Sequence, residues 1–143
     1  ETRTRALVVD DEPMIARSAG RILRGPNTGI GSTADCADPG MAVEALTREG
    51  VRDSVALVVS DFNMPGGMNG IQFARHIRTV LGETKIPFLL MSAGWRPEFL
   101  DTVKRAVRAG HVDAFLEKPF APEALLAAVE KAIERRIMLL GNL

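Results

Sequence analysis

Residues 6–13 read Ala-Leu-Val-Val-Asp-Asp-Glu-Pro, and this short stretch contains both the main structural pattern of the chain and its densest group of acids. The first four residues are apolar without alternation, which is typical of a strand buried on both faces in a parallel sheet covered by helices. Three acidic residues follow directly, and Pro13 stands where the first turn of a helix tolerates a missing N–H. The stretch therefore predicts a buried strand whose carboxyl end is acidic and leads into a helix.

The same pattern recurs along the chain. Further strand-like apolar runs lie at residues 55–59, 87–91 and 112–116, with a weaker one at 32–37. Between them, segments with apolar residues spaced by three and four predict helices around residues 15–23, 42–46, 71–81, 99–107 and 125–137. The helix boundaries are marked by Pro13, Pro97 and Pro122 at starts and by Gly25, Gly50 and Gly110 at ends. Five alternations of strand and helix predict an α/β (βα)5 fold, a doubly wound five-stranded parallel sheet with helices on both faces.

The composition narrows the class of protein. The 143 residues are about what one compact domain uses, and we expect a single domain over residues 1–143 with a core at about 4–136 and a helical extension at 137–143. Eighteen Lys and Arg balance eighteen Asp and Glu, so the chain lacks the excess of cations with which nucleic-acid-binding proteins neutralise phosphates. Cys36 is the only cysteine, which excludes an internal disulfide and a cysteine-built zinc site. No apolar run reaches the roughly 20 residues of a membrane helix, so we expect a cytoplasmic protein without membrane insertion.

Polar side chains stand where the predicted strands end. Three acids, Asp10, Asp11 and Glu12, follow the first strand, Asp61 follows the run at 55–59, Ser92 follows 87–91, and Lys118 follows 112–116. In a doubly wound sheet these ends share one edge, where ligands bind. Clustered carboxylates repel one another unless a cation neutralises them, and oxygen-only ligands favour Mg²⁺. Lysine and serine complete a phosphate-binding set, and a carboxylate can then accept a phosphoryl group as an acyl phosphate.

Four motifs, taken in their order along the chain, resemble the receiver domains of two-component response regulators. These domains form the CheY-like superfamily and have a flavodoxin-like fold. They are Val-Val-Asp-Asp-Glu at 8–12, Asp-Phe-Asn-Met-Pro at 61–65, Met-Ser-Ala at 91–93 and Lys-Pro-Phe at 118–120. The resemblance spans nearly the whole chain. It departs from the family in one additional residue, at Gly66 or Gly67, and in the long stretch 25–40.

The resemblance implies a role for each motif. Asp61 would be the phosphoacceptor, and Mg²⁺ would be held by Asp10, Asp11, Asp61 and the backbone carbonyl of Asn63. Lys118 would pair with the acceptor carboxylate before phosphorylation and with the phosphate afterwards.

Two further residues would form the switch. The hydroxyl of Ser92 would sense the phosphoryl group, and Phe115 would be the aromatic residue that turns inward in response. Pro119 would follow a cis peptide bond that directs Lys118 inward.

In the same way, the resemblance implies a bacterial signalling switch rather than a metabolic enzyme. A histidine kinase or a histidine phosphotransfer protein would donate the phosphoryl group. The output would be a protein contact or a domain outside this chain, without direct nucleic-acid binding, and a homodimer could form through the helix at 99–107, the strand at 112–116 and the helix at 125–137.

Three alternatives stay open at this point. Asp10 or Asp11 could cap the following helix. A phosphatase that resembles the haloacid dehalogenase family would also use an aspartate nucleophile with Mg²⁺. In that family a second Asp, the general acid, stands two residues after the nucleophile, where this chain has Asn63. A receiver that is never phosphorylated could act as a docking module.

The apolar residues at 137–140 would pack on the core, contact a partner or begin a linker.

Overall fold

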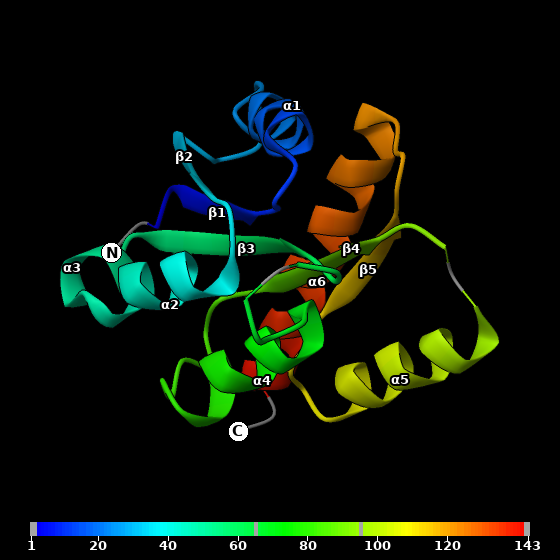
Figure 1. Cartoon of the computed structure of the whole chain (residues 1–143). Coiled ribbons are helices and arrows are strands. Elements are labelled where there is room, and N and C mark those ends of the chain that lie inside the picture. Colours follow the sequence, from blue (N-terminus) through cyan, green and yellow to red (C-terminus); the bar gives the residue numbers. More distant parts are fainter. Residues whose placement is uncertain (1–2, 65, 95, 142–143) are drawn as a thin grey trace.

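The computed structural model of the chain describes residues 3–64, 66–94 and 96–141 (Figure 1). Pro65 of the motif at 61–65 and Trp95, which the sequence places in a loop after the fourth strand, lie outside the described residues. Among the described helices, none combines the length and the apolar character needed to cross a bilayer.

Five parallel strands form one sheet, as the apolar runs predict. The strands are β1 (Arg5–Val9), β2 (Ser32–Cys36), β3 (Val55–Asp61), β4 (Phe88–Ser92) and β5 (Ala114–Glu117), in the spatial order β2-β1-β3-β4-β5. The weak run at 32–37 is therefore a true strand at one edge of the sheet. The chain winds in both directions from β1, so the strand order reverses between β1 and β3, where a doubly wound sheet leaves a crevice at its carboxyl edge.

Helices cover both faces of this sheet (Figure 1). They are α1 (Pro13–Leu23), α2 (Pro39–Thr47), the single turn α3 (Glu49–Arg52), α4 (Gly70–Thr79), α5 (Pro97–Arg108) and α6 (Pro122–Gly141). Apolar residues of α1 and α6 pack on one face of the sheet, and those of α2, α4 and α5 pack on the other. The fold is the predicted three-layer arrangement.

Alternation within the strands explains why both faces are apolar. In β1, Leu7 and Val9 belong to the apolar cluster under α2, α4 and α5, whereas Ala6 and Val8 belong to the cluster under α1 and α6. Successive side chains of a strand point to opposite faces, so a strand covered on both sides must be apolar at every position. The unbroken apolar runs of the sequence are therefore required by the two helical layers.

The predicted helix starts are confirmed, and one predicted end is wrong. Pro13, Pro97 and Pro122 each begin a helix. Gly50, however, lies inside α3, because α2 has already ended at Thr47.

The helix α2 ends without a glycine: its C-cap is Arg48, which is extended and whose N–H donates to the carbonyl of Ala45. A further contact comes from the side chain of Arg52. Its Nε donates to the carbonyl of Leu46 at 2.8 Å, and a terminal N–H donates to the carbonyl of Leu81 at 3.1 Å. A carbonyl near the end of α2 is thus satisfied by a side chain.

A buried charge cluster lies at the amino-terminal edge of β4 and β5. Asp113 is 4% exposed and is contacted by Arg78 of α4 at 3.1 Å and by Arg136 of α6 at 2.8 Å. Its Oδ2 also accepts from the backbone N–H of Phe88 at 2.8 Å. Terminal N–H groups of Arg136 donate to the carbonyls of Thr84 and Gly110. The cluster therefore joins two helices, two strands and two loops.

We expect Asp113→Ala to lower the free energy of unfolding by about 3–5 kcal/mol, because it leaves two buried guanidinium groups without their shared carboxylate. Chemical denaturation measures this loss. Glu134→Ala, at an exposed position of α6, is the matched control and should change stability by no more than about 0.5 kcal/mol. Equal losses in the two variants would show that the cluster does not stabilise the fold.

Gly70 sets the distance between α4 and the end of β3. A Cβ at this position would lie 2.4 Å from the carbonyl oxygen of Asp61 and 2.7 Å from Cδ1 of Leu90. The helix can start so close to the strand because its first residue has no side chain. Its N–H donates to the carbonyl of Phe62 at 2.8 Å, and Asn69 caps the helix by accepting from the N–H of Gln72.

Gly70→Ala should therefore destabilise the protein by about 2 kcal/mol or more, since backbone must move to admit the methyl group. Gly50→Ala should act in the opposite direction and stabilise by about 0.5–1 kcal/mol, because nothing lies within 4 Å of its Cβ position and alanine favours a helix. Thermal or chemical unfolding of both variants distinguishes close packing from a general effect of removing glycine. The close-approach argument fails if both variants are stabilised.

Candidate functional site

The sheet register brings the predicted polar residues to one edge. Asp61 is paired with Met91, and Ser92 with Glu117, the residue before Lys118. The N–H of Lys118 donates to the carbonyl of Ser92 at 2.9 Å. The last residues of β1, β3, β4 and β5 therefore open onto a common surface.

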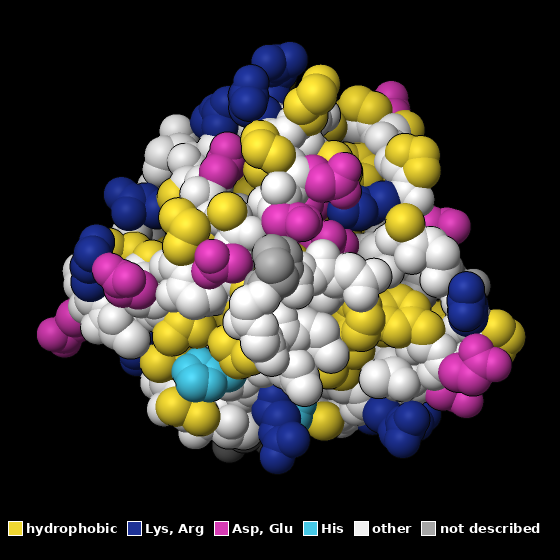
Figure 2. Space-filling view, viewed as in Figure 1, with side chains coloured by type: hydrophobic (Ala, Val, Ile, Leu, Met, Phe, Trp, Pro, Cys, Tyr) yellow, Lys and Arg dark blue, Asp and Glu magenta, His cyan; other side chains and the backbone are white. Residues whose placement is uncertain are grey.

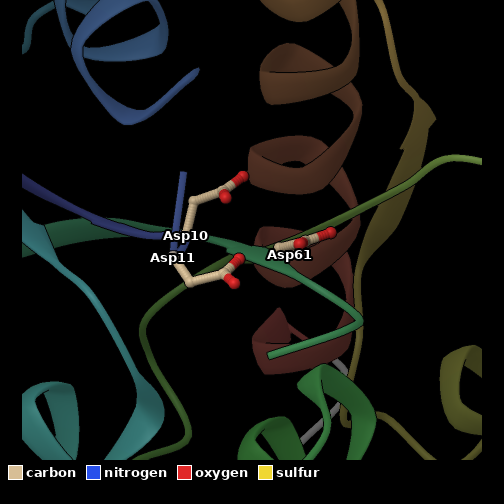
Figure 3. Close-up of side chains that lie close together, drawn as sticks. All are labelled: Asp10, Asp11 and Asp61. Carbon is tan, nitrogen blue, oxygen red and sulfur yellow. The ribbon is translucent and has the colours of Figure 1, made fainter. Parts of the chain in front are cut away.

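Three carboxylates meet there (Figure 3). Asp10 and Asp11 follow the end of β1, Asp61 ends β3, and one oxygen from each lies within 4.8 Å of the others. Asp10 and Asp61 are buried, whereas Asp11 is exposed. The cluster is thus formed across two adjacent strands, with its open side at Asp11.

Lys118 reaches into this cluster from the end of β5. Its Nζ lies 3.1 Å from Oδ2 of Asp10 and 3.2 Å from Oδ1 of Asp61, and its side chain is only 9% exposed. The Lys118–Pro119 peptide bond is cis, as the family resemblance implies. The ammonium group is therefore shared between the two buried carboxylates, and not confined to the predicted pair with Asp61.

Burial and charge shift the pKa values of this pair. Burial is the main cause that raises the pKa of Asp61; the charge of Asp10 raises it further, and Lys118 opposes the shift. For Lys118, burial lowers the pKa, but the hydrogen bond to Asp10 and the charges of both aspartates outweigh it and raise the pKa. Lys118 therefore stays protonated, while ionised Asp61 is costly to bury and gains from an additional cation.

The chemistry of the ligand set fits a hard divalent cation. Three carboxylates face one ammonium, which leaves two negative charges when all are ionised. Asp11 extends the set to the surface, where an ion can enter. Oxygen ligands without histidine or cysteine are those that Mg²⁺ and Ca²⁺ prefer.

The backbone fixes one oxygen of Asp61. The N–H of Phe62 donates to Oδ1 of Asp61 at 2.9 Å, on the same oxygen that Lys118 contacts. The ring of Phe62 packs edge-on against Phe99 in the first turn of α5, with centroids 4.4 Å apart. No sequence pattern indicates the contact between Phe62 and Phe99, because a contact between separate elements has no local signature.

Ser92 and Phe115 occupy neighbouring strands. Ser92 is buried at 2% exposure, and its hydroxyl donates to the carbonyl of Ala93 at 3.0 Å. Phe115, on β5, is 40% exposed. Asn63 is exposed in the loop that follows Asp61.

Glu12 explains why helix capping is a poor account of the acidic stretch. Glu12 is the residue that precedes the first turn of α1, and its side chain makes no capping hydrogen bond. Asp10 accepts from the N–H of Glu12 at 2.9 Å, outside the first helical turn. Oε1 of Glu12 lies 3.7 Å from Nζ of Lys118, so Glu12 adds a fourth, exposed acid to the cluster.

Comparisons with known proteins agree with this geometry. Residues 6–130 match the response regulator receiver domain family. The chemotaxis protein CheY of Pseudomonas aeruginosa is 33% identical over 129 residues, which cover 90% of this chain and 95% of that protein. The structure of the chemotaxis protein CheY4 of Vibrio cholerae superposes with a TM-score of 0.72 at 25% identity, over 91% of this chain and 98% of CheY4.

Longer regulators match as well. The DNA-binding response regulator MtrA of Mycolicibacterium smegmatis is 35% identical over 133 residues, 93% of this chain but 52% of MtrA. The C4-dicarboxylate transport transcriptional regulatory protein DctD of P. aeruginosa is 28% identical over 142 residues, 99% of this chain but 28% of DctD. The chain thus spans about half or less of these two regulators and nearly all of CheY. Since the family match covers most of its length, the chain belongs to the receiver domain family of two-component response regulators.

Proposed function

We propose that this chain is a phosphoryl-accepting switch in which Asp61 receives the phosphoryl group in a Mg²⁺-dependent reaction. The observation that carries the proposal is the position of Asp61, buried between Lys118 and two further aspartates at the edge where all parallel strands end. Asp10, Asp11, Asp61 and the backbone carbonyl of Asn63 would hold Mg²⁺. The bound ion would offset the charge of the carboxylates and of the incoming phosphoryl oxygens.

Other residues of the chain orient the carboxylate of Asp61 and stabilise the charge of the phosphoryl group. Oδ1 of Asp61 is held by the N–H of Phe62 and by Lys118, which leaves Oδ2 free of protein hydrogen bonds within the described residues. Oδ2 attacks the phosphorus of a phosphohistidine donor; an O–P bond forms, the N–P bond breaks, and the released imidazole takes up a proton. Lys118 then stabilises the charge of the bound phosphoryl group.

The switch uses groups that are poised on the two adjacent strands. Ser92 exchanges its hydrogen bond with the carbonyl of Ala93 for one with a phosphoryl oxygen. This movement opens space behind β4, into which the exposed ring of Phe115 turns. Phosphorylation thereby shifts the populations of two conformations of the face formed by α5, β5 and α6.

Family membership favours this function over the two rivals. A dehalogenase-type phosphatase needs a general acid near the nucleophile, and the residue two positions after Asp61 is Asn63, which has no acidic proton to donate. A docking module that is never phosphorylated would not need a buried lysine between two buried aspartates.

The partners follow from the same chemistry. The donor is a histidine kinase or a histidine phosphotransfer protein, and the output is a protein contact or a separate domain. Residues 1–143 would form one receiver domain with its core at about 4–136. Two apolar clusters on the two faces of one sheet support this single core region. A homodimer through α5, β5 and α6 is compatible with the exposure of Ile137 and Met138 on α6.

The acceptor assignment predicts one covalent adduct. After incubation with acetyl phosphate and Mg²⁺, intact-mass spectrometry should detect one added phosphoryl group on the native chain and none on Asp61→Asn. EDTA should prevent the adduct in the native chain. Asp53→Asn, at an exposed position after α3, is the matched control and should be phosphorylated like the native chain. Because fast hydrolysis could hide the adduct, Mg²⁺-dependent stabilisation by beryllofluoride is measured on the same samples. If neither the phosphoryl adduct nor the stabilisation by beryllofluoride is detected, the proposed switch is wrong and the docking module becomes the supported function.

The metal assignment predicts a stability change that does not depend on phosphorylation. Mg²⁺ should raise the thermal unfolding temperature of the native chain, because it binds the folded acidic cluster and not the unfolded chain. Asp11→Asn should weaken Mg²⁺ binding by about tenfold or more, as one charged ligand is lost. Asp101→Asn, an exposed change of the same charge on α5, should leave it unchanged. The assignment is wrong if both variants bind Mg²⁺ like the native chain.

A further inference from the structure

A groove between α4 and α5 has a lining that the phosphoryl site does not use. Its volume is about 590 Å³, and its polar lining side chains are Gln72, Arg75, Thr79, Thr102, Arg105 and His111. Every one of these side chains can donate a hydrogen bond, and none is acidic. The groove lies on the helices of one sheet face, away from the carboxyl edge that holds Asp61.

The two arginines of the groove lack acidic partners. Arg75 and Arg105 are exposed, and neither forms an ion pair with any described residue. In Figure 2, dark-blue side chains stand over the lower parts of α4 and α5, with no magenta side chain between them. The groove therefore presents two arginine charges that nothing within the described chain neutralises.

The charge of Arg75 acts on His111, which lines the same groove. Partial burial lowers the pKa of His111, and the positive charges of Arg75, Arg78 and Arg136 lower it further. Of these three arginines, Arg78 and Arg136 contact Asp113, whereas Arg75 forms no ion pair with any described residue. An anionic ligand would reduce this mutual repulsion.

The spread of the donors indicates the shape of the ligand. Gln72, Arg75 and Thr79 follow one another along α4, and at 1.5 Å per residue they extend over about 10 Å of helix. A site for a single phosphate has converging donors, whereas this one has donors along two helices. Between them the lining is apolar, at Ile71 and Ala106. An extended ligand with both acidic and aliphatic side chains fits both features.

We propose that the groove between α4 and α5 binds an acidic peptide segment of another protein. Carboxylates of that segment pair with Arg75 and Arg105, and its aliphatic side chains cover Ile71 and Ala106. Planar bidentate pairing makes arginine well suited to carboxylates. The inference goes beyond the proposed phosphoryl switch and does not depend on it, since none of these residues contacts the site at Asp61.

The test uses the full chain and a dye-labelled peptide of Glu and Leu that is long enough to span the two helices. Fluorescence anisotropy at low salt measures the affinity. The double variant Arg75→Glu/Arg105→Glu should weaken binding by about tenfold or more. The control, Arg17→Glu/Arg21→Glu on α1, changes the net charge equally at exposed positions and should alter the affinity by about twofold or less. Unchanged thermal unfolding of both variants shows that the fold is intact.

Equal losses in the two double variants would overturn the proposal, because binding would then reflect net charge alone. The proposal also fails if the native chain does not bind the peptide. A third contrary result is tighter binding of inorganic triphosphate than of the peptide with the same dependence on Arg75 and Arg105, which would identify a small polyanion as the ligand. In ¹⁵N-labelled protein, peptide-induced chemical-shift changes confined to α4 and α5 support the proposed position.

Discussion

The buried contact of Lys118 with Asp10 and Asp61 is the interaction on which the site depends. The carboxyl ends of parallel strands lie at one edge of the sheet. The acids that follow β1 and the acid that ends β3 are therefore close together despite their mutual repulsion. A single ammonium at 3.1 Å and 3.2 Å from the two carboxylates makes that proximity tolerable without neutralising the whole cluster. The remaining negative charge is what would attract a divalent cation to this edge.

The two edges of the sheet treat buried charge differently. At the amino-terminal edge, Asp113 is held by two arginines and a backbone N–H, and the arginines also donate to loop carbonyls. That cluster pairs its carboxylate with two guanidinium groups of the chain itself and links α4 to α6. At the carboxyl edge, burial raises the pKa of Asp61 despite the nearby lysine, so the ionised carboxylate is less favourable there than in water.

The strands and the acidic edge could be predicted from sequence because their signals are local. An apolar run such as residues 6–9 indicates a strand that is buried on both faces, and the acids that follow it indicate where the strand ends. The Arg78–Asp113–Arg136 cluster was missed because its members are 35 and 23 residues from their shared aspartate, and each alone looks like a surface charge. Gly50 does not mark the helix end because α2 already ends at the extended residue Arg48, and the single turn α3 follows. Gly70 was missed because only the tertiary approach of α4 to β3 reveals why a side chain is forbidden there.

Phe62, the residue after Asp61, connects Asp61 to two helices of the neighbouring layer, α4 and α5. The carbonyl of Phe62 accepts from Gly70 at the start of α4, its N–H binds Oδ1 of Asp61, and its ring packs on Phe99 at the start of α5. A change in the charge or position of the Asp61 carboxylate therefore acts on a residue that contacts α4 and α5 directly. These contacts are distinct from the switch proposed for Ser92 and Phe115. Because packed elements move between discrete arrangements rather than deform continuously, Phe62 is placed to relate the position of the Asp61 carboxylate to the spacing of α4 and α5.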